Sequence, residues 1–234
     1  MIQINKNKKQ LIECLNIIKE LVSEVDITFN INNIFIRAVH PSNHCMIILK
    51  IKSSLFEEYK IESEITYTLD TQILSKIIKS LSDKIISIFP EDDVLIFKDS
   101  SHEYKLNYFV GSKDERPEPA FEHKNKIKLT SLEFFNNISD CLTFDQIGNI
   151  QIEDNKMFMN SKSHMVKGKI EIVTEKIEGV NDIAFFDFLY IDMIKELKTL
   201  FKDISINIDN EFPLQIKCED DNINFNFILA NRIE

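Results

Sequence analysis

Apolar residues recur every three or four positions in four segments of the chain, a spacing typical of one buried face of an α-helix. Asp70 or Thr71 is expected to cap the second helix, and Thr130-Ser-Leu-Glu133 has the capping-box pattern that begins the third. The positions expected to be buried are, helix by helix, Leu11, Leu15, Ile18 and Val22; Leu74, Ile77, Ile78 and Leu81; Leu132, Phe135, Ile138 and Leu142; and Leu189, Met193, Ile194, Leu197 and Leu200.

The other periodic segments predict strands, because they alternate in polarity and are rich in β-branched and aromatic residues. In the first half these segments are 27–31, 34–38, 46–51, 65–69 and 105–110. The order of elements then repeats. The matching elements are 74–81 with 191–197, 86–88 with 204–206, 94–96 with 214–216, and 106–108 with 225–227. A nearly fixed offset of about 117–120 residues indicates an internal duplication.

A charged segment with two prolines, 111–125, lies between the halves and is typical of an extended linker. The sequence therefore predicts an α+β fold of two similar domains, each an antiparallel β-sheet covered by two helices. The expected boundaries are 1–112 for the first domain, 113–126 for the connecting linker and 127–234 for the second domain.

Composition fits this interpretation, since 44% of the 234 residues are hydrophobic and 28% are charged. No run approaches eighteen apolar residues and the N-terminus has no apolar signal core, so we expect an intracellular protein that does not contact membranes. The four cysteines occur singly, which favours reduced, packed thiols over disulfides or a zinc site. They are Cys14, Cys45, Cys141 and Cys218.

The formal net charge of −10 contrasts with the basic surfaces of proteins that bind nucleic acid. A negative net charge is compatible with phosphate binding when the positive charges are confined to one surface of the protein.

Motifs for catalysis are missing. Asp92-Asp93 and Asp220-Asp221 are paired carboxylates, but both lie in turn-like segments and are better explained as hairpin tips. No glycine-rich phosphate loop or Gly-x-Ser-x-Gly elbow occurs. His40 and His44 are four residues apart, yet Pro41 prevents the helical geometry of a metal pair. We therefore predict no catalytic residue, metal site or cofactor. A duplicated α+β enzyme with an unrecognised site remains an alternative.

Several short segments, in order along the chain, carry a resemblance to one family. They are Glu24–Asn43 with its hairpin and His40-Pro41-Ser42, Phe56-Glu-Glu-Tyr59, Tyr190, Glu211-Phe-Pro-Leu214, and the ending Leu229-Ala-Asn-Arg-Ile-Glu234. Together they resemble the DNA sliding clamps of the proliferating-cell-nuclear-antigen family, of the archaeal and eukaryotic type. His40 replaces an Asp of the family pattern and Asn231 replaces a Pro. Asn33 stands where the family has Gly, and Asn tolerates a left-handed turn nearly as well.

The resemblance implies a non-enzymatic processivity factor for DNA replication and repair. Six domains close the family's rings, so two domains per chain imply a homotrimer around double-stranded DNA. Edge strands near Lys105–Val110 and Lys167–Val173 would pair between subunits, and a separate ATP-driven loader would open the ring. A checkpoint-type or viral relative, acting as a heteromer subunit or without ring closure, is the alternative. The compartment would be the cytoplasm or nucleoid in an archaeon and the nucleus in a eukaryote.

The resemblance also implies two sites. Helix lysines would face DNA phosphates without reading sequence. They are Lys8, Lys9, Lys19, Lys76, Lys79, Lys195 and Lys198. The third helix offers Glu133 and Asp140 but no lysine. An apolar pocket would bind peptides of the polymerase, the loader and other client proteins. Its residues would be Val39, Met46, Ala120, Phe121, Pro213, Ile228, Ala230 and Ile233. Asn231 is expected to free a backbone that Pro restricts, and so to weaken peptide binding.

Overall fold

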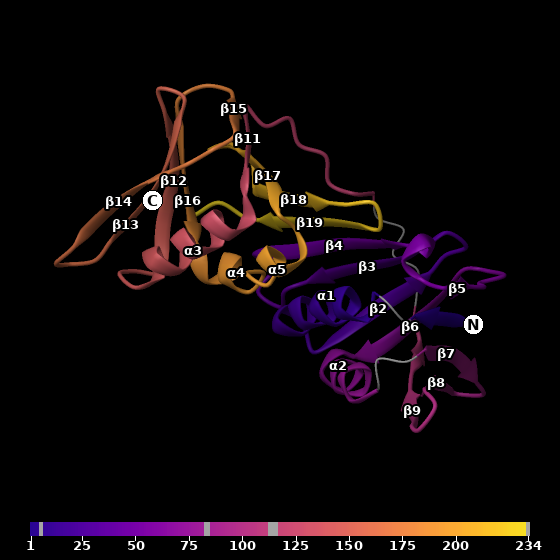
Figure 1. Cartoon of the computed structure of the whole chain (residues 1–234). Coiled ribbons are helices and arrows are strands. Elements are labelled where there is room, and N and C mark those ends of the chain that lie inside the picture. Colours follow the sequence, from indigo (N-terminus) through magenta and orange to yellow (C-terminus); the bar gives the residue numbers. More distant parts are fainter. Residues whose placement is uncertain (5–6, 82–84, 112–116, 233–234) are drawn as a thin grey trace. The chain divides into compact units, whose positions relative to one another are not determined.

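The computed structural model describes residues 1–4, 7–81, 85–111 and 117–232 (Figure 1). The chain divides into two compact units, and the longest continuous segment of the second begins at Pro117. The first unit is Met1–Pro41, Ile47–Arg116 and Asp220–Phe225, and the second is Ser42–Met46, Pro117–Glu219 and Asn226–Glu234. Within the described ranges, no helix combines the length and apolar character needed to span a membrane. Both units are built from antiparallel strands and a few helices, so the predicted α+β class is confirmed.

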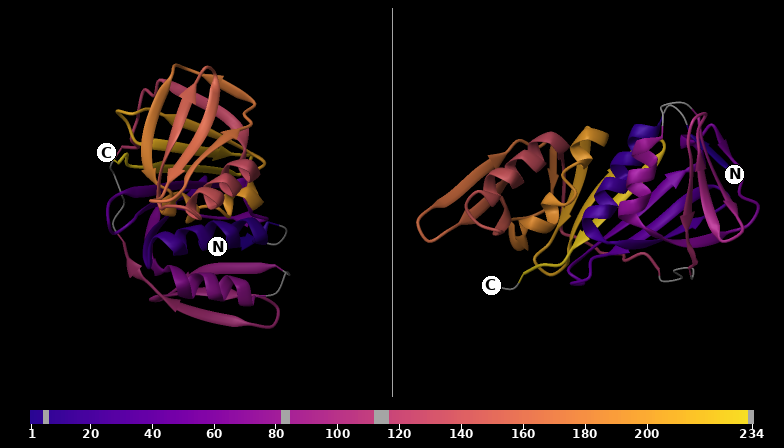
Figure 2. Two further views of the ribbon diagram at one scale, coloured as in Figure 1. Left: turned by 90° about the vertical axis from the view of Figure 1, so that its left-hand side faces the viewer. Right: turned by 90° about the horizontal axis from the view of Figure 1, so that it is seen from below.

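The first unit contains two antiparallel sheets and two α-helices. In chain order its elements are β1 (Ile2–Ile4), α1 (Lys8–Leu21), β2 (Glu24–Phe29), β3 (Asn33–Val39), β4 (Cys45–Lys52), a 3-10 turn (Ser53–Leu55), β5 (Glu58–Tyr59), β6 (Ile65–Asp70), α2 (Thr71–Ser80), β7 (Ile86–Glu91), β8 (Val94–Lys98), β9 (Glu103–Asn107) and β10 (Phe109–Val110). The strand orders are β10-β6-β2-β3-β4 and β5-β1-β7-β8-β9. Helices α1 and α2 lie side by side (Figure 2), and the Ser75 hydroxyl donates to Asn16 Oδ1 between them at 3.1 Å.

The second unit repeats this plan. Its elements are β11 (Asn125–Thr130), α3 (Ser131–Leu142), β12 (Ile147–Glu153), β13 (Lys156–Lys162), β14 (Lys167–Ile172), β15 (Lys176–Glu178), β16 (Asp182–Asp187), α4 (Phe188–Asp192), α5 (Leu197–Leu200), β17 (Asp203–Ile208), β18 (Leu214–Glu219) and β19 (Ile223–Leu229). The strand orders are β14-β13-β12-β16 and β19-β18-β17-β11-β15. The strand–helix and hairpin order predicted from the sequence is therefore present in both halves.

The first two helices bury the apolar faces that their spacing predicts. Leu11, Leu15 and Ile18 of α1 are buried, as are the four predicted apolar positions of the second helix. Val22 is the exception, because it is the C-cap of α1 and is only half-buried. Together with strand residues such as Ile36 and Phe97, which are 2% and 1% exposed, they form the core of the first unit. Burial of each such side chain contributes roughly 1.5–3 kcal/mol, so packing rather than helix propensity holds these helices in place.

Asp70, one of the two residues predicted to cap the second helix, is the N-cap of α2. Its carboxylate accepts the Ile73 N–H at 2.7 Å and so satisfies a backbone donor that the helix leaves open. We expect Asp70→Ala to lower the free energy of unfolding by about 1 kcal/mol. Thr130→Ala is the matched control, because Thr130 precedes α3 without a side-chain cap bond. Urea titrations of both variants measure the difference, and equal losses would contradict this assignment.

The predicted capping box of the third helix is wrong. Thr130 makes no capping bond, and Glu133 Oε1 instead accepts the Val173 N–H at 2.9 Å. The Ser131 hydroxyl donates to the carbonyl of Phe201, which draws the start of α3 to the end of α5. The buried face is consequently shifted: Leu132 is 57% exposed, whereas Phe134 is fully buried. Hydrogen bonds to residues distant in sequence thus take the place of the predicted capping box at the start of α3.

The last predicted helix is also different, because it is broken into α4 and α5. Asp187 caps α4 by accepting the Leu189 N–H at 3.1 Å. Buried residues follow every third position from Phe188 to Leu197, and Leu189 is 41% exposed. Bonds from Ile194 N–H to the Ile191 carbonyl, and from Leu197 N–H to the Ile194 carbonyl, are the tighter type of a 3-10 turn. The sequence predicts a regular α-helix, but the side chains that pack into the core are three positions apart, which a 3-10 geometry places on one face.

The turns agree with the predictions in two places and differ in a third. Asp92 has a left-handed φ of 50° at the tip of the β7–β8 hairpin. Asp220 accepts the Asn222 and Ile223 N–H groups at 2.7 Å in the turn before β19. Both acidic pairs therefore lie at hairpin tips. Asn33 begins β3 and does not have a positive φ, so the expected left-handed turn at this residue is wrong.

All four cysteines are buried and unpaired, as predicted. Burial raises the pKa of Cys14 to about 12, with smaller contributions from Asp220 and Glu13. Burial likewise raises the pKa of Cys45 to about 12 and raises the pKa of Cys141 and Cys218. Thiols with such pKa values stay protonated and are poor nucleophiles or metal ligands near neutral pH.

Candidate functional site

The exposed faces of α1 and α2 carry the largest group of predicted lysines. Lys9, Lys76 and Lys79 are exposed, while Lys19 is partly buried and pairs with Glu20 at 3.3 Å. The side chains of Lys76 and Lys79 are three positions apart, so they lie on the same helix face. Three exposed lysines therefore lie on the helix pair of the first unit, while the charge of Lys19 is partly offset by Glu20.

Lys8 does not belong to that surface. It is 7% exposed, and its ammonium group donates to the Leu81 carbonyl at the end of α2. The expectation that Lys8 lies on an exposed polar face is therefore wrong. A buried ammonium group needs such a partner because desolvation without one is costly. Lys8 links α1 to α2 and is a structural residue.

The helices of the second unit present mixed charge. Lys195 forms an ion pair with Asp192 at 2.8 Å, and Lys198 donates to Asn136 Oδ1 of α3 at 3.2 Å. Asp140 of α3 is exposed, and α3 contains no lysine. Pairing with neighbouring side chains reduces what these two lysines offer to an external anion.

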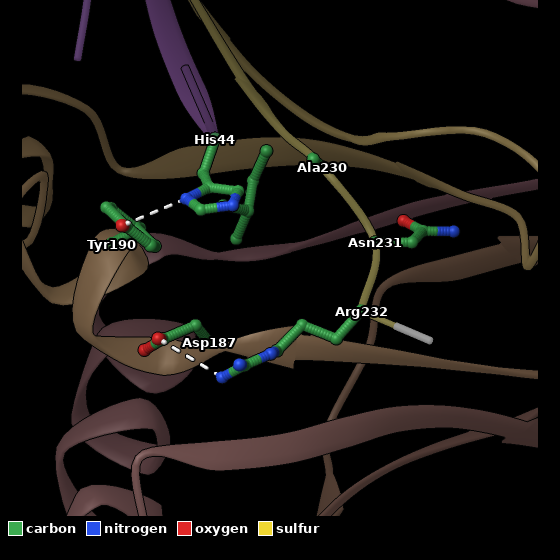
Figure 3. A pocket seen from close by; sticks show the side chains of 7 residues that line it. His44, Asp187, Tyr190, Ala230, Asn231 and Arg232 are labelled. Carbon is green, nitrogen blue, oxygen red and sulfur yellow. Dashed lines mark hydrogen bonds and ion pairs between the residues drawn. The ribbon is translucent and has the colours of Figure 1, made fainter. Parts of the chain in front are cut away.

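A pocket of about 490 Å³ lies entirely within the second unit (Figure 3). The residues that line it are His44, Asp187, Tyr190, Leu229, Ala230, Asn231 and Arg232. The tail after β19 forms one wall. It is fixed there because Ala230 N–H donates to the His44 carbonyl and Arg232 N–H donates to the Phe185 carbonyl, both at 2.8 Å. The wall is thus built by backbone bonds between segments distant in sequence.

Polar side chains surround the pocket while the tail supplies apolar atoms. Tyr190 Oη lies 3.3 Å from His44 Nδ1 and 3.0 Å from Ser42 Oγ, which fixes the ring of Tyr190 beside the 42–44 loop. On the other side Arg232 pairs with Asp187 at 3.6 Å, and Figure 3 shows its side chain reaching across the pocket. An apolar surface bordered by a few oriented hydrogen-bonding groups is suited to hold a short peptide segment.

The predicted pocket residues are only partly brought together. Ala230 lines the pocket, Ala120 is exposed, and Ile228 is a core residue at 4% exposure. Phe121 instead packs with His123 and Phe212, and His123 Nε2 lies 2.7 Å from the Pro213 carbonyl.

The other predicted residues lie in different surroundings. Met46 is half-buried in the second unit, and Val39 belongs to the first unit. Ile233 lies outside the described residues.

Sequence reasoning missed most of the polar wall. The sequence argues against a metal pair of His40 and His44 but does not assign His44 to the pocket, and Asp187 and Arg232 are 45 positions apart with no motif joining them. The available signal was the resemblance itself, because Tyr190 and the tail 229–234 both belong to it. Neither segment alone indicates that they meet around one pocket.

The two predicted edge strands are sheet edges in their own units (Figure 1). In the second unit, Ser163 N–H donates to the Val166 carbonyl at 2.8 Å, and the β13–β14 register continues from that bond. Because bonded and non-bonded pairs alternate in an antiparallel ladder, every second residue of β14 points its N–H and C=O away from β13. These residues are Lys167, Lys169 and Glu171.

The same reasoning applies to β9 in the first unit. Asp99 N–H donates to the His102 carbonyl at 3.0 Å, in register with the β8–β9 pairs. Glu103, Lys105 and Asn107 therefore direct their backbone groups outward. Both edges carry outward-facing lysine and glutamate side chains, and both have the backbone groups needed to receive another strand.

Comparisons with known proteins agree with this architecture. Residues 3–116 match the family model described as proliferating cell nuclear antigen, N-terminal domain. A DNA polymerase sliding clamp from Archaeoglobus fulgidus is 28% identical over 231 residues, covering 92% of this chain and 91% of that protein.

Two solved structures share the fold. The PCNA2–PCNA3 complex from Sulfolobus tokodaii has a TM-score of 0.88 at 17% identity, and A. fulgidus PCNA with the C-terminal region of FEN-1 has 0.89 at 24% identity. Each match covers 100% of this chain and 99% of the other chain. In sequence and in fold, the chain is similar over nearly its whole length to the DNA sliding clamps of the proliferating-cell-nuclear-antigen type.

Proposed function

We propose that this protein is a DNA polymerase processivity factor that closes into a ring around duplex DNA and tethers replication and repair proteins. The observation that carries the proposal is the pair of open edges, β9 in one unit and β14 in the other, on a chain that is similar to the sliding clamps. The protein acts inside the cell and performs no reaction of its own.

Ring closure follows from joining these edges between copies. Outward backbone groups on Glu103, Lys105 and Asn107 can pair with those on Lys167, Lys169 and Glu171 of a second copy. A head-to-tail contact of two different edges closes a cycle when the rotation between copies fits. We propose three copies, because six units close the rings of this family. Pairing also covers edges that would otherwise favour aggregation.

The basic face of α1 and α2 is proposed to contact phosphates of the enclosed DNA. Lys9, Lys76 and Lys79 are exposed there, and such contacts are independent of sequence. The net charge of −10 opposes such a contact only weakly, because charges farther away than a Debye length of about 8–10 Å are largely screened.

We expect the double variant Lys76→Glu, Lys79→Glu to lower retention on circular DNA and loader-dependent polymerase stimulation. Each lost phosphate contact should reduce the slope of log affinity against log salt by about one unit. The control is Lys126→Glu with Lys128→Glu, which makes the same charge change on exposed positions of β11 that alternate with the buried residues of that strand. Equal effects of the two double variants would show that net charge, not the helix face, governs DNA retention.

The pocket beside the tail is proposed to receive peptides of client proteins. Its apolar tail wall and the polar groups of His44, Tyr190 and Arg232 can hold one short turn of peptide backbone with its anchors. The aromatic cluster of Phe121 and Phe212 is proposed as a second apolar contact for the same peptide. The C-terminal region of A. fulgidus FEN-1, which is bound to a clamp in a solved structure, is a suitable probe.

A further inference from the structure

Three consecutive residues fix the tail of the second unit, and the middle one does so through its side chain. Ala230 and Arg232 donate their backbone N–H groups to the carbonyls of His44 and Phe185. Between them, Asn231 donates from its side-chain amide to the Asp209 carbonyl at 2.9 Å. Because a carbonyl oxygen only accepts, the amide nitrogen of Asn231 must face it. In Figure 3 the Asn231 side chain points to the opposite side of the tail from His44, Tyr190 and Asp187.

The anchor at Asp209 is a rigid junction. Its fully buried carboxylate accepts the N–H of Glu211 at 2.8 Å and the N–H of Lys124 at 3.2 Å. The Lys124 ammonium lies 3.5 Å from the same carboxylate. Burial alone would raise the pKa of Asp209, but these N–H groups and the Lys124 charge outweigh it and lower the pKa. Asp209 therefore stays ionised at neutral pH and holds the segment before β11 and the turn before β18 together.

The side-chain amide of Asn231 is held at this junction by its nitrogen alone, and its oxygen has no hydrogen-bond partner among the described residues. That oxygen, Oδ1, is buried. An unsatisfied buried acceptor opposes stability, so the Asn231–Asp209 bond adds little to the overall free energy of folding. Its main effect is local, because it fixes the tail residue between two residues that wall the pocket.

We infer that Asn231 is a positioning residue for peptide binding, which fixes the pocket wall by attaching the tail to the Asp209 junction. This inference rests on the proposed client-binding function of the pocket. It reverses the expectation that Asn231 leaves the tail freer than the proline of the family pattern. A proline restrains the backbone through its ring, whereas Asn231 restrains it through a side-chain bond. In both cases the wall is ordered before the peptide arrives, which reduces the entropic cost of binding.

The experiment compares Asn231→Ala with Asn231→Pro. Alanine removes the bond and adds no restraint. Proline also removes the bond but restrains the backbone. It is the residue of the family pattern here, Asn231 has no positive φ, and the backbone N–H that proline would remove donates to no residue in the described ranges. We expect Asn231→Ala to weaken binding of the FEN-1 C-terminal peptide by roughly five- to thirtyfold in calorimetric titration. Asn231→Pro is expected to retain binding within about threefold, and the thermal midpoint of both variants is expected to change by less than about 3 °C.

A second measurement needs no peptide. Amide hydrogen exchange of Ala230 and Arg232 should accelerate in Asn231→Ala and stay slow in Asn231→Pro, since exchange reports local opening. Unchanged exchange and unchanged peptide affinity in Asn231→Ala would overturn the inference, as would equal loss in both variants. Failure of the unmodified protein to bind the peptide would instead count against the proposed function, while the exchange result would still decide the role of Asn231.

Discussion

Replacing Lys169 with proline is expected to convert the assembled protein into monomers that remain folded. Light scattering coupled to size-exclusion chromatography should give about three times 27.4 kDa for the unmodified chain and 27.4 kDa for the variant. The reason is geometric. Lys169 directs its N–H away from β13, so proline removes a donor from the open edge without breaking the internal β13–β14 ladder.

The matched control is Lys169→Ala, which keeps the outward N–H but removes the side chain. That side chain pairs with Glu153 at 3.0 Å and lies over the Phe158 ring at 3.9 Å. Exposed pairs of this kind contribute at most about 1 kcal/mol, so the control should remain assembled. If the unmodified chain is monomeric at tens of micromolar, or if Lys169→Pro assembles normally, β14 is not the closing edge. Assembly only in the presence of a related second chain would favour the heteromer alternative.

Loss of peptide binding is the second large effect, and we expect it from Ala230→Asp. The variant places a carboxylate on the tail wall of the pocket, where a docked peptide would exclude water from it. Burying that charge unpaired should cost about 3 kcal/mol, or roughly a hundredfold in Kd, and abolish polymerase stimulation. Arg232, two residues further along the chain, already pairs with Asp187. It is therefore a poor ion-pair partner for the new carboxylate at position 230.

Ala230→Ser is the control, since it adds a small neutral group at the same position. The oligomeric mass of both variants should equal that of the unmodified protein, because Ala230 belongs to neither edge strand and its backbone N–H bonds to the His44 carbonyl. Calorimetry with the FEN-1 C-terminal peptide gives the comparison. Equal affinity of Ala230→Asp and the unmodified protein would place the docking site away from this pocket. Ile228→Asp would be a weaker test, because Ile228 is a core residue whose replacement would disturb the fold.

Local patterns in the sequence were sufficient where one helix face or one turn decides the outcome. The helical spacing in α1 and α2 and the Asp92 and Asp220 turns follow from neighbouring residues alone. Local patterns did not predict the start of the third helix, because Glu133 accepts a bond from Val173 instead of capping the helix. They also did not predict the final helical segment, where buried residues such as Phe188 and Ile194 belong to a repeat of three positions. These choices depend on partners 40 or more residues away, or on the shape of the core, and leave no local signal.

The site was harder to predict for the same reason. Ala230 and Tyr190 could be located by the family resemblance, but the pairing of Asp187 with Arg232 could not. Gly148 illustrates the constraint: a Cβ there would lie 2.2 Å from the Phe188 ring, so the small residue in β12 allows α4 to pack where Tyr190 reaches the pocket. No periodicity expresses such a fit between a strand and a helix.

The unequal charge of the two helix pairs has a consequence for motion along DNA. The first unit offers exposed Lys9, Lys76 and Lys79, whereas the second offers paired Lys195 beside exposed Asp140. If the proposed ring forms with these helices facing the DNA, attractive and weakly repulsive sectors would alternate around the hole. The duplex would then be drawn off the central axis toward one basic sector at a time. Exchange between equivalent off-axis positions would let such a ring follow the turning phosphate backbone through a few short-lived contacts, so that holding the DNA and moving along it would be compatible.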